Sequence, residues 1–273
     1  MQELAANAVK YGITYKASDI RKIAGPSKAD YDNLIAQLKD QGFEIVNESK
    51  THLFITVRAE KQSIEDAFQT KLVESRGVRQ ALVPAFIPAS LSLVDSVIGL
   101  DNHRKLYPRY KIMKGASART VGDDTPGGNS PATIKTAYGF DSIYSAGFTG
   151  KGQHISIATY DGVNLDDINA YFPKIGVATG PKVDLVSFNG TAAYNMDSAM
   201  ETELDAEFSG MIAPAAQIHI FASAENSDAG ELALFTAILD DGRAHVVNYS
   251  WGSCEPNLQA AHKSAMDAFL HEQ

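Results

Sequence analysis

The sequence predicts an α/β domain with a parallel sheet covered by helices on both faces, preceded by a smaller α+β domain. After residue 131, apolar strand candidates alternate with helix candidates, which is the order typical of a parallel sheet. Before residue 111, the order is helix, two strands, helix and strand, which indicates a separate α+β unit. The 273 residues are long enough for two domains.

The elements of the first domain follow from apolar spacing and from turn residues. A helix is predicted over residues 30–41, because apolar side chains recur there at helical spacing and Gly42 follows. Ser63 is the expected N-cap of a short second helix that ends near Phe68. Strands are predicted at 43–46, 53–57 and 71–74.

A cleavable linker is predicted between the two domains. The segment 112–131 contains four glycines and two prolines among small and polar residues, so it cannot bury apolar area and is expected to be accessible to proteases. The predicted division is therefore a first domain at 1–111, a linker at 112–131 and a second domain at 132–273.

The second domain contains the alternating elements. Its ligand crevice is expected outside the carboxyl ends of the parallel strands. The last predicted helix has an apolar face that would normally lie on a sheet and be followed by another strand, so we expect this domain to be incomplete. The strands are predicted at 153–160, 183–188, 217–223 and 244–250, and the helices at 165–172, 196–211, 230–240 and 257–271.

Composition excludes several classes of protein. With 44% apolar and 21% charged residues, the chain is a globular protein and not a disordered one. A single cysteine, Cys254, excludes a framework of disulfides within the chain. No apolar stretch approaches the roughly 20 residues that span a bilayer, and we expect no signal peptide at Met1–Ala5. No metal-binding spacing of His and Cys and no phosphate-binding Gly-rich loop is present.

The net charge of −9 is divided unevenly along the chain. Residues 1–114 hold 17 Lys+Arg and 13 Asp+Glu, a balance of +4, whereas residues 115–273 have a balance of −13. Nucleic acid is therefore not an expected partner of the acidic part. The division fits two unrelated solvated surfaces, and it fits equally two domains that dock on each other.

The densest group of ionisable side chains lies on the helix predicted at 196–211. Glu201 and Asp205 lie one turn apart on one edge of this helix, and Glu203 and Glu207 lie one turn apart on the other. Two interpretations remain open: a solvated acidic face, or a carboxylate pair at a cleft, where one pKa rises and creates a general base that works in acid. Between the edges lies one apolar stripe, formed by Met200, Leu204, Phe208 and Met211.

A second candidate segment directly follows the strand predicted at 244–250. The backbone of Ser250, Trp251 and Gly252 is expected at the carboxyl edge of the sheet, where substrates bind. Gly252 beside the only tryptophan permits close approach of the backbone to a ligand. A plain turn at the end of the strand is an equally good interpretation.

Taken in order, these features resemble the sedolisin family of serine-carboxyl peptidases in their zymogen form. The resemblance covers nearly the whole chain. The motifs that carry it are Ile87–Leu91, Val97–Asp101, the Glu-x-x-Leu-Asp of Glu201–Asp205, Ala213–Ala216 and Tyr249–Gly252.

The resemblance implies a fold and residue roles. The fold is a subtilisin-like sheet preceded by a ferredoxin-like propeptide domain that serves as inhibitor and chaperone. In the family motif, Glu201 is the general base, Asp205 is its partner, and Glu203 and Glu207 are left as surface acids. Ser250, Trp251 and Gly252 supply the backbone and pocket wall for substrate. The nucleophilic serine, the oxyanion-stabilising aspartate and the calcium ligands are expected beyond residue 273, so no cofactor is expected within the chain.

The implied function is that of a proenzyme portion of an acid-acting endopeptidase that hydrolyses peptide bonds. Expected partners are peptide or protein substrates and the propeptide docked on its own catalytic domain, in a secreted monomer without membrane or nucleic-acid contacts. The uneven charge suggests that affinity for the propeptide falls from pH 7 to pH 4, as carboxylates become protonated. The alternative is a truncated, inactive homologue that acts as an inhibitor or binding module. A histidine-type subtilisin is disfavoured, because no His precedes a Gly.

Overall fold

The computed structural model describes residues 6–7, 10–11, 15–108, 131–186, 188, 190, 192–254 and 258–270. It contains two compact units. The first combines Met1–Leu106 with Glu225–Gly242 and Ser253–Gln273, and the second combines Tyr107–Ala224 with Arg243–Gly252. Residues 112–130 of the predicted linker lie outside the described residues, and the predicted domain boundaries stay a prediction. None of the helices described is long and apolar enough to cross a membrane.

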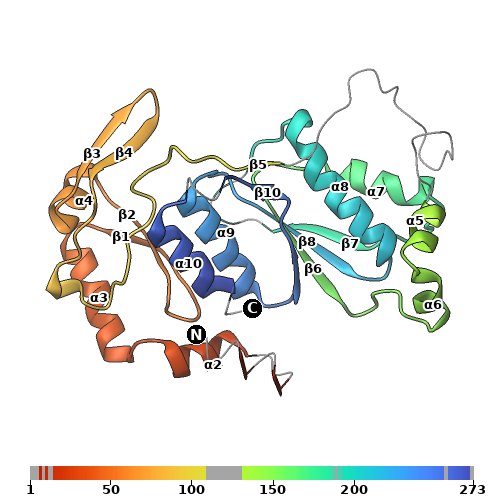
Figure 1. The fold of residues 1–273 in the computed structure, drawn as a ribbon, viewed down its shortest axis with the longest axis horizontal. Coiled ribbons are helices and arrows are strands. Elements are labelled where there is room, and N and C mark those ends of the chain that lie inside the picture. The colour runs from red at the N-terminus through yellow and green to blue at the C-terminus, as the bar shows by residue number, and fades with distance from the viewer. Residues whose placement is uncertain are drawn as a thin grey trace. The chain divides into compact units, whose positions relative to one another are not determined.

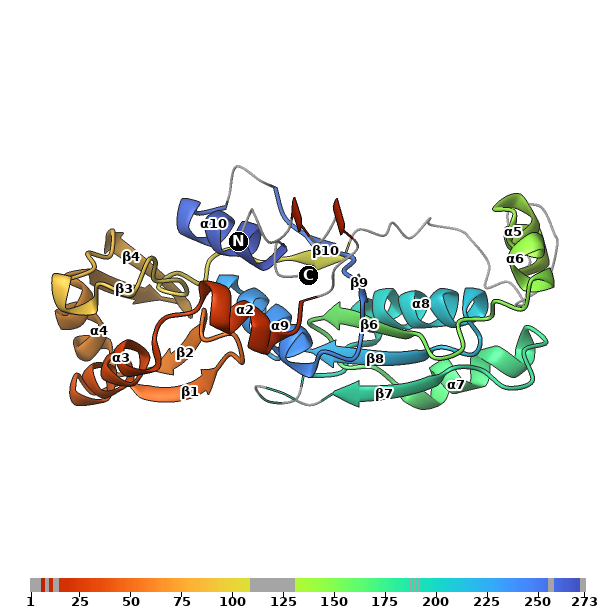
Figure 2. The same ribbon diagram turned by 90° about the horizontal axis from the view of Figure 1, so that it is seen from below.

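The first unit contains two separate β-hairpins (Figure 2). Strand β1 pairs antiparallel with β2, and β3 pairs antiparallel with β4, a strand that the sequence pattern did not predict. The predicted ferredoxin-like arrangement is therefore not confirmed. The elements of this unit are α2 Ala17–Ala24, α3 Lys28–Asp40, β1 Glu44–Glu48, β2 Ile55–Arg58, α4 Lys61–Phe68, β3 Lys71–Ser75, β4 Val78–Val83, the 3₁₀ turn η1 Ala89–Leu91, α9 Asp228–Asp241 and α10 Ala260–Leu270.

Local signals in the sequence account for most of these boundaries. The α3 helix begins after Ser27, whose hydroxyl accepts the Asp30 N–H, and it ends just before Gly42, which has a φ of 85°. The prediction that Ser63 caps α4 is wrong, because α4 begins two residues earlier, after Glu60. A hydrophobic core closes this part of the unit and consists of Leu34, Leu38, Phe43, Phe68 and Leu91.

The second unit is built on a four-stranded parallel sheet with the order β7-β8-β6-β9 (Figure 2). The alternation of strands and helices predicted from the sequence is confirmed. The elements of this unit are β5 Tyr107–Pro108, α5 Pro131–Ala137, α6 Phe140–Ser145, β6 His154–Thr159, α7 Leu165–Lys174, β7 Lys182–Val186, α8 Met196–Ile212, β8 Gln217–Ala222, β9 Val246–Asn248 and β10 Trp251–Gly252.

Helices α7 and α8 lie beside each other against the sheet (Figure 1). Their shared core contains Ile157 and Ile220 from the strands, Ile168 and Phe172 from α7, and Ala206 from α8. Burying these side chains supplies most of the free energy that holds the helices on the sheet, at about 1.5–3 kcal/mol for each large side chain.

The apolar stripe predicted on α8 does not form the buried face of the helix. Met200, Leu204 and Phe208 are exposed, with 41–44% of their surface accessible, and only Met211 of the stripe is buried. Most of the other buried residues of α8 are small: Ala199, Thr202, Ala206 and Gly210. At Gly210, an added Cβ would lie 2.6 Å from Phe172 Cζ, so the close approach of α7 and α8 requires a residue without a side chain.

The order of the strands determines where a ligand can bind. Strand β6 lies between β8 and β9, and Ile157 is the register partner of Asn248 on β9. The connection from β6 to β7 and the connection from β8 to β9 therefore run in opposite directions across the sheet, and the crevice at the carboxyl ends of the strands is the expected ligand position in such a fold. The strand predicted at 244–250 is shorter in the structure, where β9 covers only Val246–Asn248.

Candidate active site

The structure brings Glu201, Asp205 and Ser250 together within the second unit. Glu201 and Asp205 lie one turn apart on α8, and Ser250 lies on the segment between β9 and β10. The Ser250 hydroxyl donates a hydrogen bond to Asp205 Oδ1 at 3.1 Å. The serine of the predicted substrate segment therefore contacts Asp205, one acid of the predicted pair.

Both acids have raised pKa values. Burial raises the pKa of Glu201, the negative charge of Asp205 raises it further, and the hydrogen bond with Ser250 opposes the shift. Burial also raises the pKa of Asp205, against hydrogen bonds from Ser250 and Asn248. Two interacting carboxyl groups of this kind hold a shared proton over a range of pH, so the pair retains one ionised member in acid.

The Glu201 carboxyl group is the more buried of the two. The residue is only 8% exposed, and its Oε2 atom is buried without a hydrogen-bond partner among the described residues. Buried polar atoms in native proteins are nearly always hydrogen bonded, so an unpaired carboxylate oxygen indicates a group that is positioned for another partner. A general base has this property before its substrate or nucleophile is bound.

A pair of buried threonines fixes α8 to the central strand. The hydroxyl groups of Thr159 on β6 and Thr202 on α8 lie 2.6 Å apart, and both residues are fully buried. Because Thr202 directly follows Glu201, the pair also holds the candidate base in place.

An aromatic cluster surrounds the predicted substrate segment. The Trp251 ring stands edge-on to the Tyr160 ring at 5.2 Å between centroids, and the hydroxyl groups of Tyr160 and Tyr249 lie 3.0 Å apart. Trp251 is 8% exposed. This packing fixes the direction in which the backbone of residues 250–252 leaves the sheet.

The backbone of the predicted substrate segment already pairs with another extended segment. Strand β10, formed by Trp251 and Gly252, pairs antiparallel with β5, formed by Tyr107 and Pro108. The β5 segment directly precedes the predicted linker. Residues 251–252 can therefore form a strand pairing with an extended peptide, which is the role predicted for them.

The prediction that Glu203 and Glu207 are surface acids is only partly right. Both are half-buried, and Glu203 Oε1 accepts the Asn164 N–H at 3.2 Å. Burial, with the charge of Glu203 as the second cause, raises the pKa of Glu207 to about 7. Glu203 thereby lies at the start of α7, and no hydrogen bond from the Ser250 segment to either acid is found among the described residues.

One group of side chains of metal-binding types occurs among the described residues. Asp228, Glu231 and His262 are buried, and their ligand atoms lie within 4.8 Å of one another. The Arg104 guanidinium contacts all three, so a cation already occupies their centre. Calcium, which the family resemblance implies, prefers six to eight oxygen ligands. These residues therefore do not fit the implied calcium ion.

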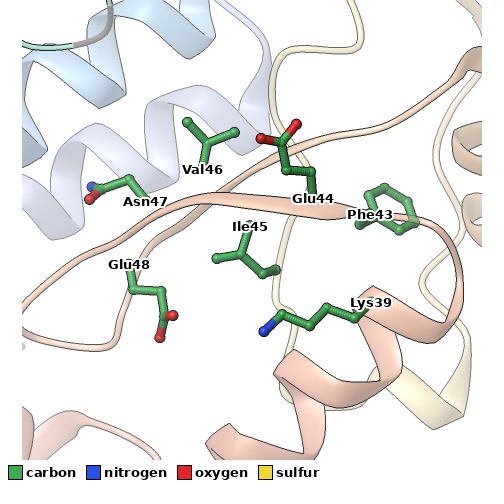
Figure 3. A pocket seen from close by; sticks show the side chains of 7 residues that line it. All are labelled: Lys39, Phe43, Glu44, Ile45, Val46, Asn47 and Glu48. Atoms are coloured by element: carbon green, nitrogen blue, oxygen red, sulfur yellow. The ribbon is translucent and has the colours of Figure 1, made fainter.

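A shallow pocket in the first unit lies along β1 (Figure 3). The side chains of Ile45 and Lys39 lie on one side of the strand, and Glu44 and Val46 point to the other. The side chains that line this pocket do not include the paired acids or the Ser250 segment, so the pocket is separate from the candidate active site. Its lining consists of Lys39, Phe43, Glu44, Ile45, Val46, Asn47 and Glu48.

Sequence reasoning missed several residues of the site. Asn248, Tyr160 and Thr202 have no motif of their own, and only their positions at the ends of β9 and β6 and on the buried face of α8 could have indicated them. Arg104 is likewise a single basic residue in an irregular segment.

Comparison with known proteins gives a family model and several relatives. Residues 2–103 match the family described as "Pro-kumamolisin, activation domain". The chain is similar to sedolisin from Pseudomonas sp. (strain 101), with 28% identity over 86% of the chain and 42% of the relative. Xanthomonalisin from Xanthomonas sp. (strain T-22) is 25% identical over 91% of the chain and 32% of the relative. Kumamolisin from Bacillus sp. (strain MN-32) is 32% identical over 67% of the chain and 34% of the relative. The chain thus spans between 32% and 42% of the length of these relatives.

Proposed function

Because the chain is a sedolisin-family protein with a pro-kumamolisin-like activation domain, we propose that it forms the proenzyme portion of an acid-acting serine-carboxyl endopeptidase. In this proposal, residues 1–111 are the propeptide, 112–131 the cleavable linker and 132–273 the N-terminal part of the catalytic domain. The reaction is hydrolysis of peptide bonds in protein substrates. The protein is expected to be secreted and to act as a monomer.

The observation that carries this proposal is the convergence of Glu201, Asp205 and Ser250. Glu201 acts as the general base: its carboxylate accepts the proton of a nucleophilic serine hydroxyl as the serine oxygen attacks the peptide carbonyl. Asp205 shares a proton with Glu201 and holds it in position. Their raised pKa values suit this chemistry, because such a pair is half-protonated in acid, where a histidine base would be fully protonated and inactive.

Ser250, Trp251 and Gly252 are proposed to bind the substrate backbone. The pairing of β10 with β5 supports this role, since an extended segment of the chain itself lies in the position that a substrate strand would take. Ser250 has a further role as a positioning residue, because its hydrogen bond orients Asp205.

The nucleophilic serine, the oxyanion-stabilising aspartate and the calcium ligands are assigned to the region of the relatives that this chain does not span. The 273-residue chain is therefore expected to show no peptidase activity. The alternative is an inactive homologue that acts as an inhibitor or binding module.

The test compares the chain with a version that is extended by the part of a sedolisin catalytic domain that the chain does not span. The extended protein is expected to cleave a protein substrate at pH 4, Glu201→Gln is expected to abolish cleavage, and Glu203→Gln serves as the control because Glu203 lies on the other edge of α8. Acid proteolysis by the 273-residue chain that Glu201→Gln abolishes would show that the nucleophile lies within it. Retained cleavage in the extended Glu201→Gln protein would overturn the proposed role of Glu201.

A further inference from the structure

The Arg104 guanidinium is buried among polar and charged side chains, which include residues of two helices. Its Nε atom donates to the Asp228 carboxylate and its Nη2 atom to the Glu231 carboxylate, both from α9. Nη1 donates to Ser253 Oγ at 2.9 Å, and Nη2 lies 3.0 Å from His262 Nε2 on α10. The Arg104 side chain is only 5% exposed.

This environment is specific for a guanidinium group. Burial alone would lower the pKa of Arg104, but hydrogen bonds with Asp228 and Glu231 outweigh burial and raise it. The three nitrogen atoms of the planar guanidinium donate to three different residues, Asp228, Ser253 and Glu231. A lysine ammonium cannot reproduce this geometry. If the guanidinium left, two buried carboxylates would lose their counter-ion, and this loss is costly in a dry environment.

The residues on either side of Arg104 also dock on α9 and the turn before it. The Leu106 N–H donates to Asn226 Oδ1, and Asn226 Nδ2 donates to the Leu106 carbonyl, both at 2.8 Å. Lys105 Nζ donates to the Asn226 carbonyl at 2.8 Å. At Gly99, an added Cβ would lie 2.8 Å from the Ala229 Cβ. The segment 99–106 therefore follows the N-terminal end of α9 closely.

The segment 99–106 lies where the activation domain meets the predicted linker. The activation-domain match ends at residue 103, directly before Arg104, and the predicted linker begins at residue 112. Helices α9 and α10 belong to the proposed catalytic part. A cut anywhere in the linker would leave Arg104 on the activation fragment and its four partners on the other fragment.

We propose that Asp228, Glu231, Ser253 and His262 form an arginine pocket that retains the cleaved activation segment through Arg104. This inference deepens the proposed function by naming the contact that keeps the cut propeptide bound. The retention itself requires no catalysis, so it can be tested whether or not the chain is part of a peptidase.

The experiment uses the full chain with a recognition site for a sequence-specific protease placed within residues 112–130. After cleavage at pH 7, the dissociation constant between the two fragments is measured by surface plasmon resonance, with gel filtration to check that the cut protein stays together. Arg104→Gln is expected to weaken retention at least about hundredfold, as is typical when one partner of a buried charge pair is removed. Arg104→Lys keeps the charge and is expected to fall between Arg104→Gln and the unchanged chain.

The matched control is Arg58→Gln, which removes one positive charge from the same fragment at an exposed pair with Glu44. It is expected to change retention less than threefold. An equal loss in Arg58→Gln and Arg104→Gln would show that only total charge matters, and it would overturn the arginine pocket.

A second measurement covers the case in which Arg104→Gln disturbs the fold. Glu231→Gln and the double variant Arg104→Gln/Glu231→Gln are measured in the same way, with circular dichroism of the uncut chains as the check on folding. The two losses are expected to combine to much less than their product, because each variant removes the same contact. Losses that multiply fully would overturn the proposal. Because the readout is fragment retention, a chain without any link to proteolysis would give the same result.

Discussion

The hydrogen bond between Thr159 and Thr202 offers a direct test of how α8 is held on the sheet. Both residues are fully buried, and their hydroxyl oxygens lie 2.6 Å apart. Replacing either residue by valine keeps the shape and leaves the other hydroxyl without this partner. A buried, unsatisfied hydroxyl costs about 1–3 kcal/mol of unfolding free energy, whereas replacing both partners costs much less.

The two single variants are not expected to be equal. Thr159 Oγ1 also accepts the Asp161 N–H at 3.3 Å, so Thr159→Val leaves a backbone donor as well as the Thr202 hydroxyl without this acceptor. We expect a loss of about 1 kcal/mol for Thr202→Val, about 2 kcal/mol for Thr159→Val and about 1 kcal/mol for the double variant, in which only the Asp161 N–H loses its acceptor; this corresponds to a coupling energy of about 2 kcal/mol.

Urea unfolding followed by tryptophan fluorescence measures these free energies. The only tryptophan, Trp251, lies in the second unit and packs on Tyr160, which follows Thr159, so its emission reports the unfolding of this unit alone. Thr179→Val at an exposed position is the control and is expected to change stability by less than about 0.5 kcal/mol. Losses that add fully in the double variant would show that the two hydroxyl groups do not interact, and would refute this account of how α8 is anchored.

Two further predictions concern other parts of the chain. Because the pKa of Glu207 is about 7 in the folded protein and lower when unfolded, the folded state binds more protons between these values, and stability falls as pH rises from about 4.5 to 7. Glu207→Gln should flatten this pH dependence and raise the free energy of unfolding at pH 8 by about 1–2 kcal/mol, a value already reduced for the partial exposure of Glu207. An unchanged pH dependence of the urea midpoint in the variant would contradict this prediction. In the first unit, Leu91→Ala should cost about 2–5 kcal/mol, against less than about 0.5 kcal/mol for the exposed Leu93→Ala, measured by pulse proteolysis.

The sequence by itself determined the features that depend on local spacing. The alternation of β6, α7, β7, α8, β8, α9 and β9 follows from apolar periodicity, which is set by neighbours a few residues apart. The placement of Glu201 and Asp205 on one edge of α8 follows from 3.6 residues per turn. The resemblance to sedolisins, carried by short motifs, is supported by the family comparisons.

The tertiary structure alone decided which surfaces meet. Periodicity located the apolar stripe of α8, but close packing against Phe172 buries the small-residue face instead and leaves Leu204 exposed. Ser250 meets Asp205 across 45 positions of the sequence, and Arg104 meets Asp228 across 124. Contacts at such separations depend on strand order and helix packing, and no local pattern of residues records them. For this reason, the acid pair could be predicted from the sequence, whereas its serine contact and the arginine pocket could not.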